Sequence, residues 1–327
     1  MVRRRIGFPI MLELEHKDYW CAGRAFADLI PLHGSVAAVL AGAAEGRVLV
    51  DNADAPGLAL LHGPEGLYLG GSPLPGVDYS RYRPAIDGWA YLYPTSQWQE
   101  RLAEVLPHPF MLVHDRIRLT ITPKAIAPLS PPPGFSLVPD EEPLGFCILD
   151  GDRMVSRCGP DLVAGTYAEI GVWTHPDYRR QGLARVAATA CLSALAAAGI
   201  AEVGWHCLAS NRGSLALARR LGFGAAQPYQ ARSASLPAEN VGDLDTEASR
   251  TLAAHFEAGS ATIDWLGFHA AGGWALAGET GRALAAIERL VAGPWPGESQ
   301  WLEGHWALAG LRAEPRFIAS VARQAAK

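Results

Sequence analysis

The sequence lacks features that would assign it to several large classes of proteins. No apolar run is long enough to cross a bilayer, and the charged residues from Glu13 to Asp18 follow the basic start at Arg3 to Arg5 before any such run begins. The net charge of -5 gives no broad positive surface for nucleic acid. We therefore expect no signal peptide, no membrane partner and no nucleic-acid partner, and we predict a cytoplasmic protein.

Cysteine is scarce as well. The chain has five cysteines, an odd number, with no Cys-x-x-Cys pair and no histidine beside them at the spacing of metal ligands. Reduced thiols are expected, and no metal site is predicted. The cysteines are Cys21, Cys147, Cys158, Cys191 and Cys207.

Proline divides the chain. Four prolines fall within residues 128–134 and break every regular pattern there, so this segment is predicted to be a linker. A chain of 327 residues, 49% hydrophobic and 19% charged, is typical of a globular protein with two or three domains. The predicted domains are residues 1–127, 135–236 and 243–327.

The first of these segments alternates helical and strand patterns. An amphipathic helical start and a second, shorter helix precede three apolar segments with strand character. The expected helices are residues 11–29 and 35–43, and the expected strands are residues 47–51, 58–62 and 67–69.

One turn of the central segment lies where a ligand would bind. Residues 178–184, Tyr-Arg-Arg-Gln-Gly-Leu-Ala, stand between an apolar strand pattern at 169–174 and a helical pattern at 185–198 that contains neither glycine nor proline. Gly199 is expected to end that helix. The order is therefore strand, turn and helix.

The composition of this turn predicts an anion site. The first turn of a helix has free N–H groups, and its dipole attracts negative charge. Gly182 and Ala184 allow a ligand to approach the backbone closely. Arg179 and Arg180 add positive charge.

The order of motifs in this region resembles the GNAT superfamily of N-acetyltransferases. After the first strand come Arg-x-x-Gly-x-Ala at 179–184, a strand at 203–208, Asn-x-x-Ser at 211–214 and Leu-Gly-Phe at 221–223. The resemblance implies a mixed α/β fold, with a mostly antiparallel sheet flanked by helices, and an acetyl-CoA site. It places the pyrophosphate on the backbone amides of residues 180–184 and the pantetheine arm between two diverging strands.

Further details resemble a bacterial GNAT subgroup that includes zwittermicin-resistance-type enzymes. Gly-Phe-Cys at 145–147 and Thr-His-Pro-Asp-Tyr-Arg at 174–179 carry this likeness. Members of the subgroup have an additional N-terminal half, and residues 46–52 and 66–71 are similar to it. The resemblance implies that residues 1–127 form a degenerate GNAT-like domain in front of the catalytic one.

The resemblance also implies roles for single residues. The acceptor amine has to lose a proton, and Glu169 is the leading candidate for the base, with His206 as the second. The alternatives are a surface or salt-bridged Glu169 and a structural His206. A backbone N–H of Val172 or Trp173 would polarise the thioester carbonyl. The predicted cofactor-binding residues are Val172, Trp173, Thr174, Arg179, Arg180, Gln181, Gly182, Leu183, Ala184, Asn211 and Ser214.

Three residues in or beside these motifs also have purely structural interpretations. Gly171 marks either a strand bulge or close packing. Asn211 is either a pantetheine contact or a turn residue. Ser214 contacts the cofactor or caps a helix at 215–221.

Two departures from the family pattern stand out. Ala218 occupies the position at which many GNAT members have a tyrosine general acid; Tyr229 or Tyr167 is an alternative, and the acid stays unassigned. Residues 139–144 are too few for the helices that usually wall the acceptor site. The N-terminal half or the tail is expected to supply that wall.

The tail has helical patterns without strand alternation. Residues 274–284 resemble the inner turn of a tetratricopeptide helix pair, and 314–317 resemble the ending of such an array. The expected helical segments are 244–258, 262–277, 281–292, 300–311 and 315–326. The tryptophans interpreted mostly as core are Trp265, Trp274, Trp295, Trp301 and Trp306.

The predicted function is acetyl-CoA-dependent N-acetyl transfer to a primary amine of a small molecule or peptide, directly within a ternary complex and without a metal. One alternative is a catalytically decayed CoA-binding or interaction protein that uses its helical tail for a protein partner or for self-association. Another is tandem GNAT-like aminoacyl transfer from tRNA, which the acidity of the chain disfavours. The acceptor and the oligomeric state stay open.

Overall fold

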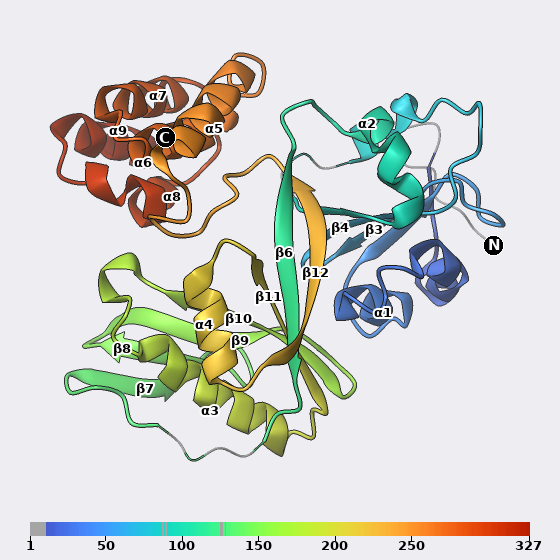
Figure 1. The fold of residues 1–327 in the computed structure, drawn as a ribbon, viewed down its shortest axis with the longest axis horizontal. Helices are drawn as coiled ribbons and strands as arrows, with labels where there is room; N and C mark the ends of the chain where they lie inside the picture. Colours follow the sequence, from blue (N-terminus) through green and yellow to red (C-terminus); the bar gives the residue numbers. More distant parts are fainter. Residues whose placement is uncertain (1–10, 87, 89, 125–126, 128) are drawn as a thin grey trace. The chain divides into compact units, whose positions relative to one another are not determined.

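The computed structural model describes residues 11–86, 88, 90–124, 127 and 129–327 (Figure 1). The chain forms two compact units. The first takes in the chain up to residue 109, with residues 113–209 and 213–233; the second consists of residues 110–112, 210–212 and 234–327. This division does not test the predicted domain boundaries, which stay predictions. Position 128 of the predicted linker lies outside the described residues.

A twelve-stranded sheet forms the centre of the first unit, in the order β1-β2-β3-β4-β5-β12-β6-β11-β10-β9-β8-β7. Neighbouring strands β2 to β4 and β7 to β10 are antiparallel, whereas β4 with β5 and β10 with β11 are parallel. The expected mixed α/β fold with a mostly antiparallel sheet is confirmed. The strands are β1 Leu12–Glu13, β2 Arg47–Val50, β3 Ala59–Gly63, β4 Gly66–Gly70, β5 Leu92–Pro94, β6 Leu112–Ile121, β7 Phe135–Pro139, β8 Phe146–Asp150, β9 Arg153–Ala164, β10 Tyr167–Thr174, β11 Glu202–Leu208 and β12 Gly224–Ser233.

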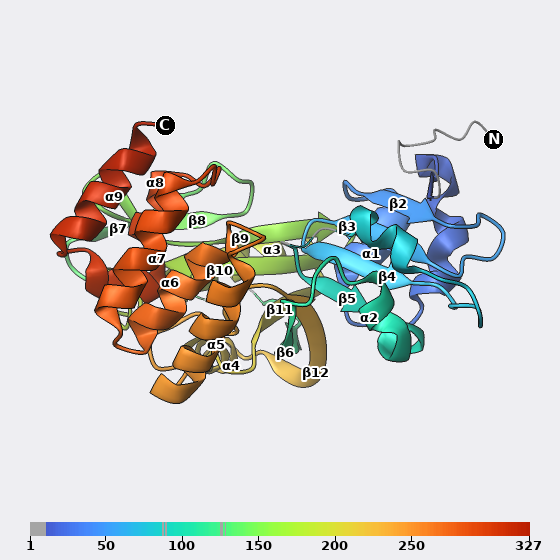
Figure 2. The same ribbon diagram turned by 90° about the horizontal axis from the view of Figure 1, so that it is seen from above.

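Helices cover this sheet. α3 packs on β8, β9 and β10 with its alanine and leucine face, and α1 packs on β3 (Figure 2). Gly199, in the left-handed region at φ 81°, follows α3 as expected. The helices of this part of the chain are η1 His16–Phe26, α1 Gly34–Leu40, η2 Ser80–Ala85, η3 Ser96–Arg101, α2 Leu102–Val105, η4 Pro176–Tyr178, α3 Leu183–Ala197 and α4 Arg212–Arg220, where η marks a 3-10 helix.

The expected helix at 11–29 is only partly correct. Leu12 and Glu13 form β1, because they pair with β2 and because Glu13 binds Arg47 with two hydrogen bonds. The chain then continues as the 3-10 helix η1 rather than as an α-helix. Strands β5, β6, β9 and β12 were not predicted.

The short connection inferred at 139–144 is confirmed. β7 and β8 form an antiparallel hairpin, with Pro139 opposite Phe146. No helix separates these two strands. The helices that usually wall a GNAT acceptor site are therefore absent from this connection.

The second unit consists mainly of helices, as expected. The predicted helix at 300–311 is divided into two, because His305 has an extended backbone with ψ 124° and its ring caps the next helix through Ala307 N–H. Trp274 and Trp295 are buried, but Trp301 is 49% exposed, so its interpretation as core was wrong. The helices are α5 Thr246–Gly259, α6 Leu266–Leu276, α7 Thr280–Ala292, α8 Ser299–Gly304, η5 Trp306–Leu311 and α9 Pro315–Ala325.

Two expectations from composition can be compared with the structure. All five cysteines are free thiols, as predicted. Within the described part of the chain, no helix has both the length and the apolar character that a bilayer crossing requires.

Candidate active site

The parallel strands β10 and β11 separate at one point. They pair from Tyr167 opposite Glu202 as far as Glu169 opposite Gly204, and their described pairing stops there. β10 continues to Thr174 with partners on β9 only. The second half of β10 therefore presents backbone groups to an unpaired side, in the place where the resemblance predicts the pantetheine arm.

A β-bulge lies at the point of separation. The register of β10 against β9 shifts between Glu169 and Ile170, and Asp161 is the additional residue on β9. A Cβ atom at Gly171 would lie 2.4 Å from a carboxylate oxygen of Asp161. Both interpretations of Gly171 therefore apply: it lies near a bulge, and it packs closely against Asp161, the additional residue of that bulge.

The predicted anion loop follows β10. Arg180 and Gly182 have left-handed backbones, with φ 63° and 83°, and Leu183 begins α3. No partner is present, among the described residues, for the backbone N–H groups of residues 180–184. Alternation of left-handed and right-handed residues turns successive N–H groups towards one concave side, which suits a phosphate group.

The side chains around this loop have structural contacts. Arg179 donates from Nε to the carbonyl oxygen of Thr174, and the Thr174 hydroxyl bonds to Ser156. Ser156 also donates to the carbonyl oxygen of Trp173, whose ring is exposed. The carbonyl groups at this end of β10 are therefore occupied.

Asn211 and Ser214 have partners of their own. The amide of Asn211 donates to Glu239 and accepts from Asn240, within the second unit. The hydroxyl of Ser214 accepts from Trp205 Nε1 at 2.9 Å. Since α4 begins at Arg212, Ser214 lies inside the helix and is not its N-cap.

Glu169 is buried, so its interpretation as a surface carboxylate was wrong. Its exposed fraction is 1%. Oε1 accepts hydrogen bonds from Tyr167 Oη at 2.7 Å and from the Gly34 backbone N–H at 3.0 Å. Oε2 has no hydrogen-bond partner among the described residues. One oxygen is thus fixed in position while the other is available.

His206 lies beside Glu169. Its Nε2 is 3.7 Å from Glu169 Oε1, and its Nδ1 is 2.8 Å from the hydroxyl of Tyr229. Burial lowers the pKa of His206 to about 4, against the opposing effect of the Glu169 charge. The ring is therefore neutral near pH 7.

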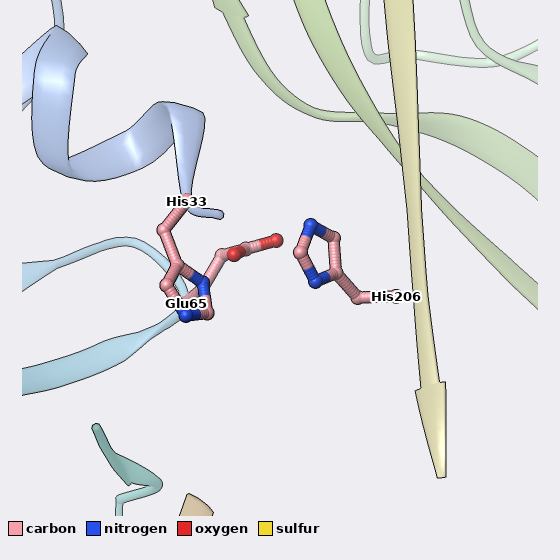
Figure 3. Close-up of side chains that lie close together, drawn as sticks. All are labelled: His33, Glu65 and His206. Carbon is pink, nitrogen blue, oxygen red and sulfur yellow. The ribbon is translucent and has the colours of Figure 1, made fainter. Parts of the chain in front are cut away.

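Glu65 and His33 complete the group, and the sequence did not point to either. Removal of its carboxyl group from water, and then the nearby charge of Glu169, raises the pKa of Glu65 to about 10. Burial, followed by the nearby charges of His206 and two arginines, holds the pKa of His33 well below its usual range. Figure 3 shows His33, Glu65 and His206 converging from the start of α1, the β3–β4 turn and β11.

Residues of the N-terminal half thus pack beside Glu169. α1 contacts β9 and β10, and its first residue, Gly34, approaches so closely that a Cβ atom there would lie 1.9 Å from the Tyr167 ring. Of the two suppliers expected from the sequence, the N-terminal half is the one observed beside Glu169 in the first unit. The spacing of motifs gave no signal for this, because the contacting residues are far apart in the sequence.

The candidate acids lie close to Glu169, the candidate base. Tyr167 donates to Glu169, and Tyr229 contacts both His206 and the Nε of Arg116. Burial raises the pKa of both tyrosines. Ala218 of α4, at the family position for a tyrosine, is fully buried in the core that α4 shares with α3.

Comparisons with known proteins agree with this geometry. Residues 140–232 match the model of the GNAT acetyltransferase family. The uncharacterized N-acetyltransferase YdfB of Bacillus subtilis is 34% identical over 85 residues, which are 26% of this chain and 32% of that protein. The chain therefore spans about a third of the length of this curated relative.

Solved structures are similar to parts of this chain. A GCN5-related N-acetyltransferase-like protein from Streptococcus suis is 22% identical with a TM-score of 0.51, over 66% of this chain and 98% of that one. A GCN5-related N-acetyltransferase from Sphaerobacter thermophilus is 16% identical with a TM-score of 0.44, over 68% and 95%. The family model and the curated relative support an acetyltransferase of the GNAT family in the matched segment, and the Streptococcus structure shows the fold.

Proposed function

We propose that this protein is an acetyl-CoA-dependent N-acetyltransferase that acts on a primary amine of a small molecule or peptide by direct transfer. The observation that carries the proposal is the separation of β10 from β11 at Glu169, with a loop of unpartnered backbone N–H groups, among the described residues, beyond the end of β10. The first feature leaves room for an extended thioester arm, and the second suits a pyrophosphate. The N-terminal residues are interpreted as the degenerate GNAT-like half of the zwittermicin-resistance-like subgroup, in a cytoplasmic enzyme.

In this proposal the acceptor nitrogen attacks the thioester carbon, and the C–S bond breaks as the N–C bond forms, so that CoA leaves as the thiolate. Oε2 of Glu169, which has no partner among the described residues, takes the amine proton. Tyr167 and the Gly34 N–H hold Oε1, so that the carboxylate keeps one orientation. A backbone N–H of Val172 or Trp173 polarises the carbonyl group.

Binding of acetyl-CoA is tested at the loop. Gly182→Asp places a carboxylate where the pyrophosphate is proposed to bind, so the mutant is expected to lose the rise in melting temperature that acetyl-CoA gives the wild type. Gly199→Asp is the matched control, since Gly199 has a similar φ of 81° at the other end of α3 and a Cβ atom there meets no neighbour. A folded Gly182→Asp protein with a wild-type shift would place the cofactor elsewhere.

A second candidate function is that of a catalytically decayed CoA-binding protein whose tetratricopeptide-like tail binds a protein partner or a second copy. The position of Ala218 in the core favours it, because the usual tyrosine acid is absent there. Thioester cleavage with a panel of small amines and peptides distinguishes the two. Cleavage that depends on amine supports the transferase, and binding without cleavage supports the decayed protein.

A further inference from the structure

The side chains His33, Glu65, Glu169 and His206, here called the His–Glu cluster, contain polar atoms that protein groups leave unsatisfied. Both ring nitrogens of His33 are buried without a hydrogen-bond partner among the described residues, and His33 is 1% exposed. The same holds for Nε2 of His206 and Oε2 of Glu169. Buried polar atoms are rarely left in this state unless something binds them.

The geometry of the cluster suits a metal ion. One ligand atom each from His33, Glu65 and His206 lies within 4.8 Å of the other two. Donors around a four-coordinate zinc lie roughly 3.3 Å apart, so closure needs each side chain to move inwards by about 1 Å. Two imidazoles and a carboxylate are a donor set used by first-row transition metals, and three protein ligands leave a position for a further donor.

The surroundings of His206 orient its ring for such a role. Tyr229 bonds to Nδ1, which leaves Nε2 as the nitrogen directed to the cluster. A hydrogen bond to the other ring nitrogen is the usual support of a histidine ligand. Tyr229 in turn accepts a hydrogen bond from Arg116 Nε.

Some charged groups near the cluster oppose the binding of a cation and others favour it. Arg116 and Arg118 of β6 weaken the attraction for a cation, but Arg118 is paired with Glu202 at 2.7 Å. Glu65 and Glu169 supply two carboxyl groups, and the charge of Glu169 favours the protonated form of Glu65. A divalent cation bound by Glu65 displaces its proton and offsets the charge of Glu169.

We propose that His33, Glu65 and His206 bind one divalent first-row transition-metal ion, with a donor set typical of zinc. The ion ties the start of α1 and the β3–β4 turn to β11, and so fixes the N-terminal half against the strand beside Glu169. His206 then serves as a ligand, and its lone pair takes no part in proton transfer. The site is separate from the predicted cofactor loop, because none of its three ligands belongs to residues 179–184.

The test uses the full chain and no acetyl-CoA, so its result is separate from that of the proposed activity. The protein is stripped with a chelator, dialysed and titrated with Co²⁺ and Zn²⁺. We expect about one equivalent of ion per chain, a visible d–d band with Co²⁺, and a rise in melting temperature with Zn²⁺. Zinc, iron, cobalt or nickel retained through purification supports the site, whereas a wild type that holds no ion and shows no Co²⁺ band overturns it.

Variants locate the ion. His33→Ala and His206→Ala are expected to abolish the Co²⁺ band, and Tyr229→Phe to weaken binding by about 10–100-fold with the band retained. His114→Ala is the matched control: His114 is also a fully buried histidine with an unpartnered ring nitrogen in the same unit, but it lies outside the cluster. A band that survives in folded His33→Ala and His206→Ala proteins contradicts the assignment. If these variants do not fold, the wild-type titration alone decides.

Discussion

Glu169 differs from most glutamates because its side chain is buried. It lies at the residue where β10 stops pairing with β11. Its carboxylate has one oxygen held by Tyr167 and Gly34 and one oxygen without a partner. A carboxylate held in this way has little freedom to turn, so its unpartnered oxygen offers a fixed acceptor for a proton.

Glu169→Gln is expected to lower turnover by about 10²- to 10⁴-fold, because the amide retains the shape and the hydrogen bonds to Oε1 but does not accept the amine proton. Acetyl-CoA affinity should stay near that of the wild type, since the side chain is not proposed to hold the cofactor. Steady-state kinetics and a thermal-shift titration measure the two effects. Glu141→Gln, at an exposed glutamate, is the control. Unchanged turnover over the full pH range would remove Glu169 from the mechanism.

Gly34 shows how closely the two halves of the first unit approach at Tyr167. Gly34→Ala is expected to destabilise the unit by about 1–3 kcal/mol, because the new methyl group would overlap the Tyr167 ring. Gly23→Ala should change stability by less than about 0.5 kcal/mol, since a Cβ atom at Gly23 meets no neighbour. Melting curves of the two variants compare them directly. Equal melting temperatures would show that α1 does not pack this closely.

At the scale of elements, the local patterns predicted most helices and strands of the molecule. α3 and β10 differ from their predicted bounds by two residues or fewer at each end, because α3 has uninterrupted helix formers and β10 is largely apolar. β6 was not predicted, since it carries His114 and Arg118 at buried positions, where strand patterns usually have apolar residues. Polar side chains are tolerated there because partners from distant parts of the chain bind one ring nitrogen of His114 and two guanidinium nitrogens of Arg118.

The same reasoning explains what was predicted of the candidate site. The loop at 179–184 is a local motif, so the sequence indicated it directly. Glu65 and His33 meet His206 only after the sheet has formed, and no spacing in a single sequence encodes such a contact. The helical pattern of residues 300–311 likewise does not indicate that the helix is interrupted at His305.

α3 packs on β9 and β10, the strands beside the candidate site. Leu192 is fully buried in the core that α3 forms with the sheet, so Leu192→Ala should cost about 2–5 kcal/mol. Leu74→Ala, at a side chain that is 56% exposed, should cost less than about 0.5 kcal/mol. Hydrogen exchange at the amides of α3 and β9 measures the difference within the first unit. Equal exchange rates in both variants would show that α3 is not anchored by this core.

At the scale of the whole molecule, the division into two units separates the loop from the helical tail. Truncation after Ser235 is expected to leave the acetyl-CoA thermal shift in place, because residues 179–184 belong wholly to the first unit. Solubility or acceptor selectivity should suffer more than cofactor binding does. The placement of the tail beside the acceptor end of the cleft stays a prediction. Loss of the thermal shift in a folded truncated protein would contradict the assignment of acetyl-CoA binding to the first unit alone.

The strand order has a consequence for synthesis of the chain. β12 stands between β5 and β6, with Arg232 opposite Leu92, so strands β1 to β5 join the rest of the described sheet only through it. β12 is also the last of the twelve strands to leave the ribosome. Until residue 233 has emerged, the nascent protein has two unfinished sheet edges, and each exposes unpaired backbone groups. Contacts between segments so distant in the sequence form slowly, so this interval is when the chain depends most on chaperones.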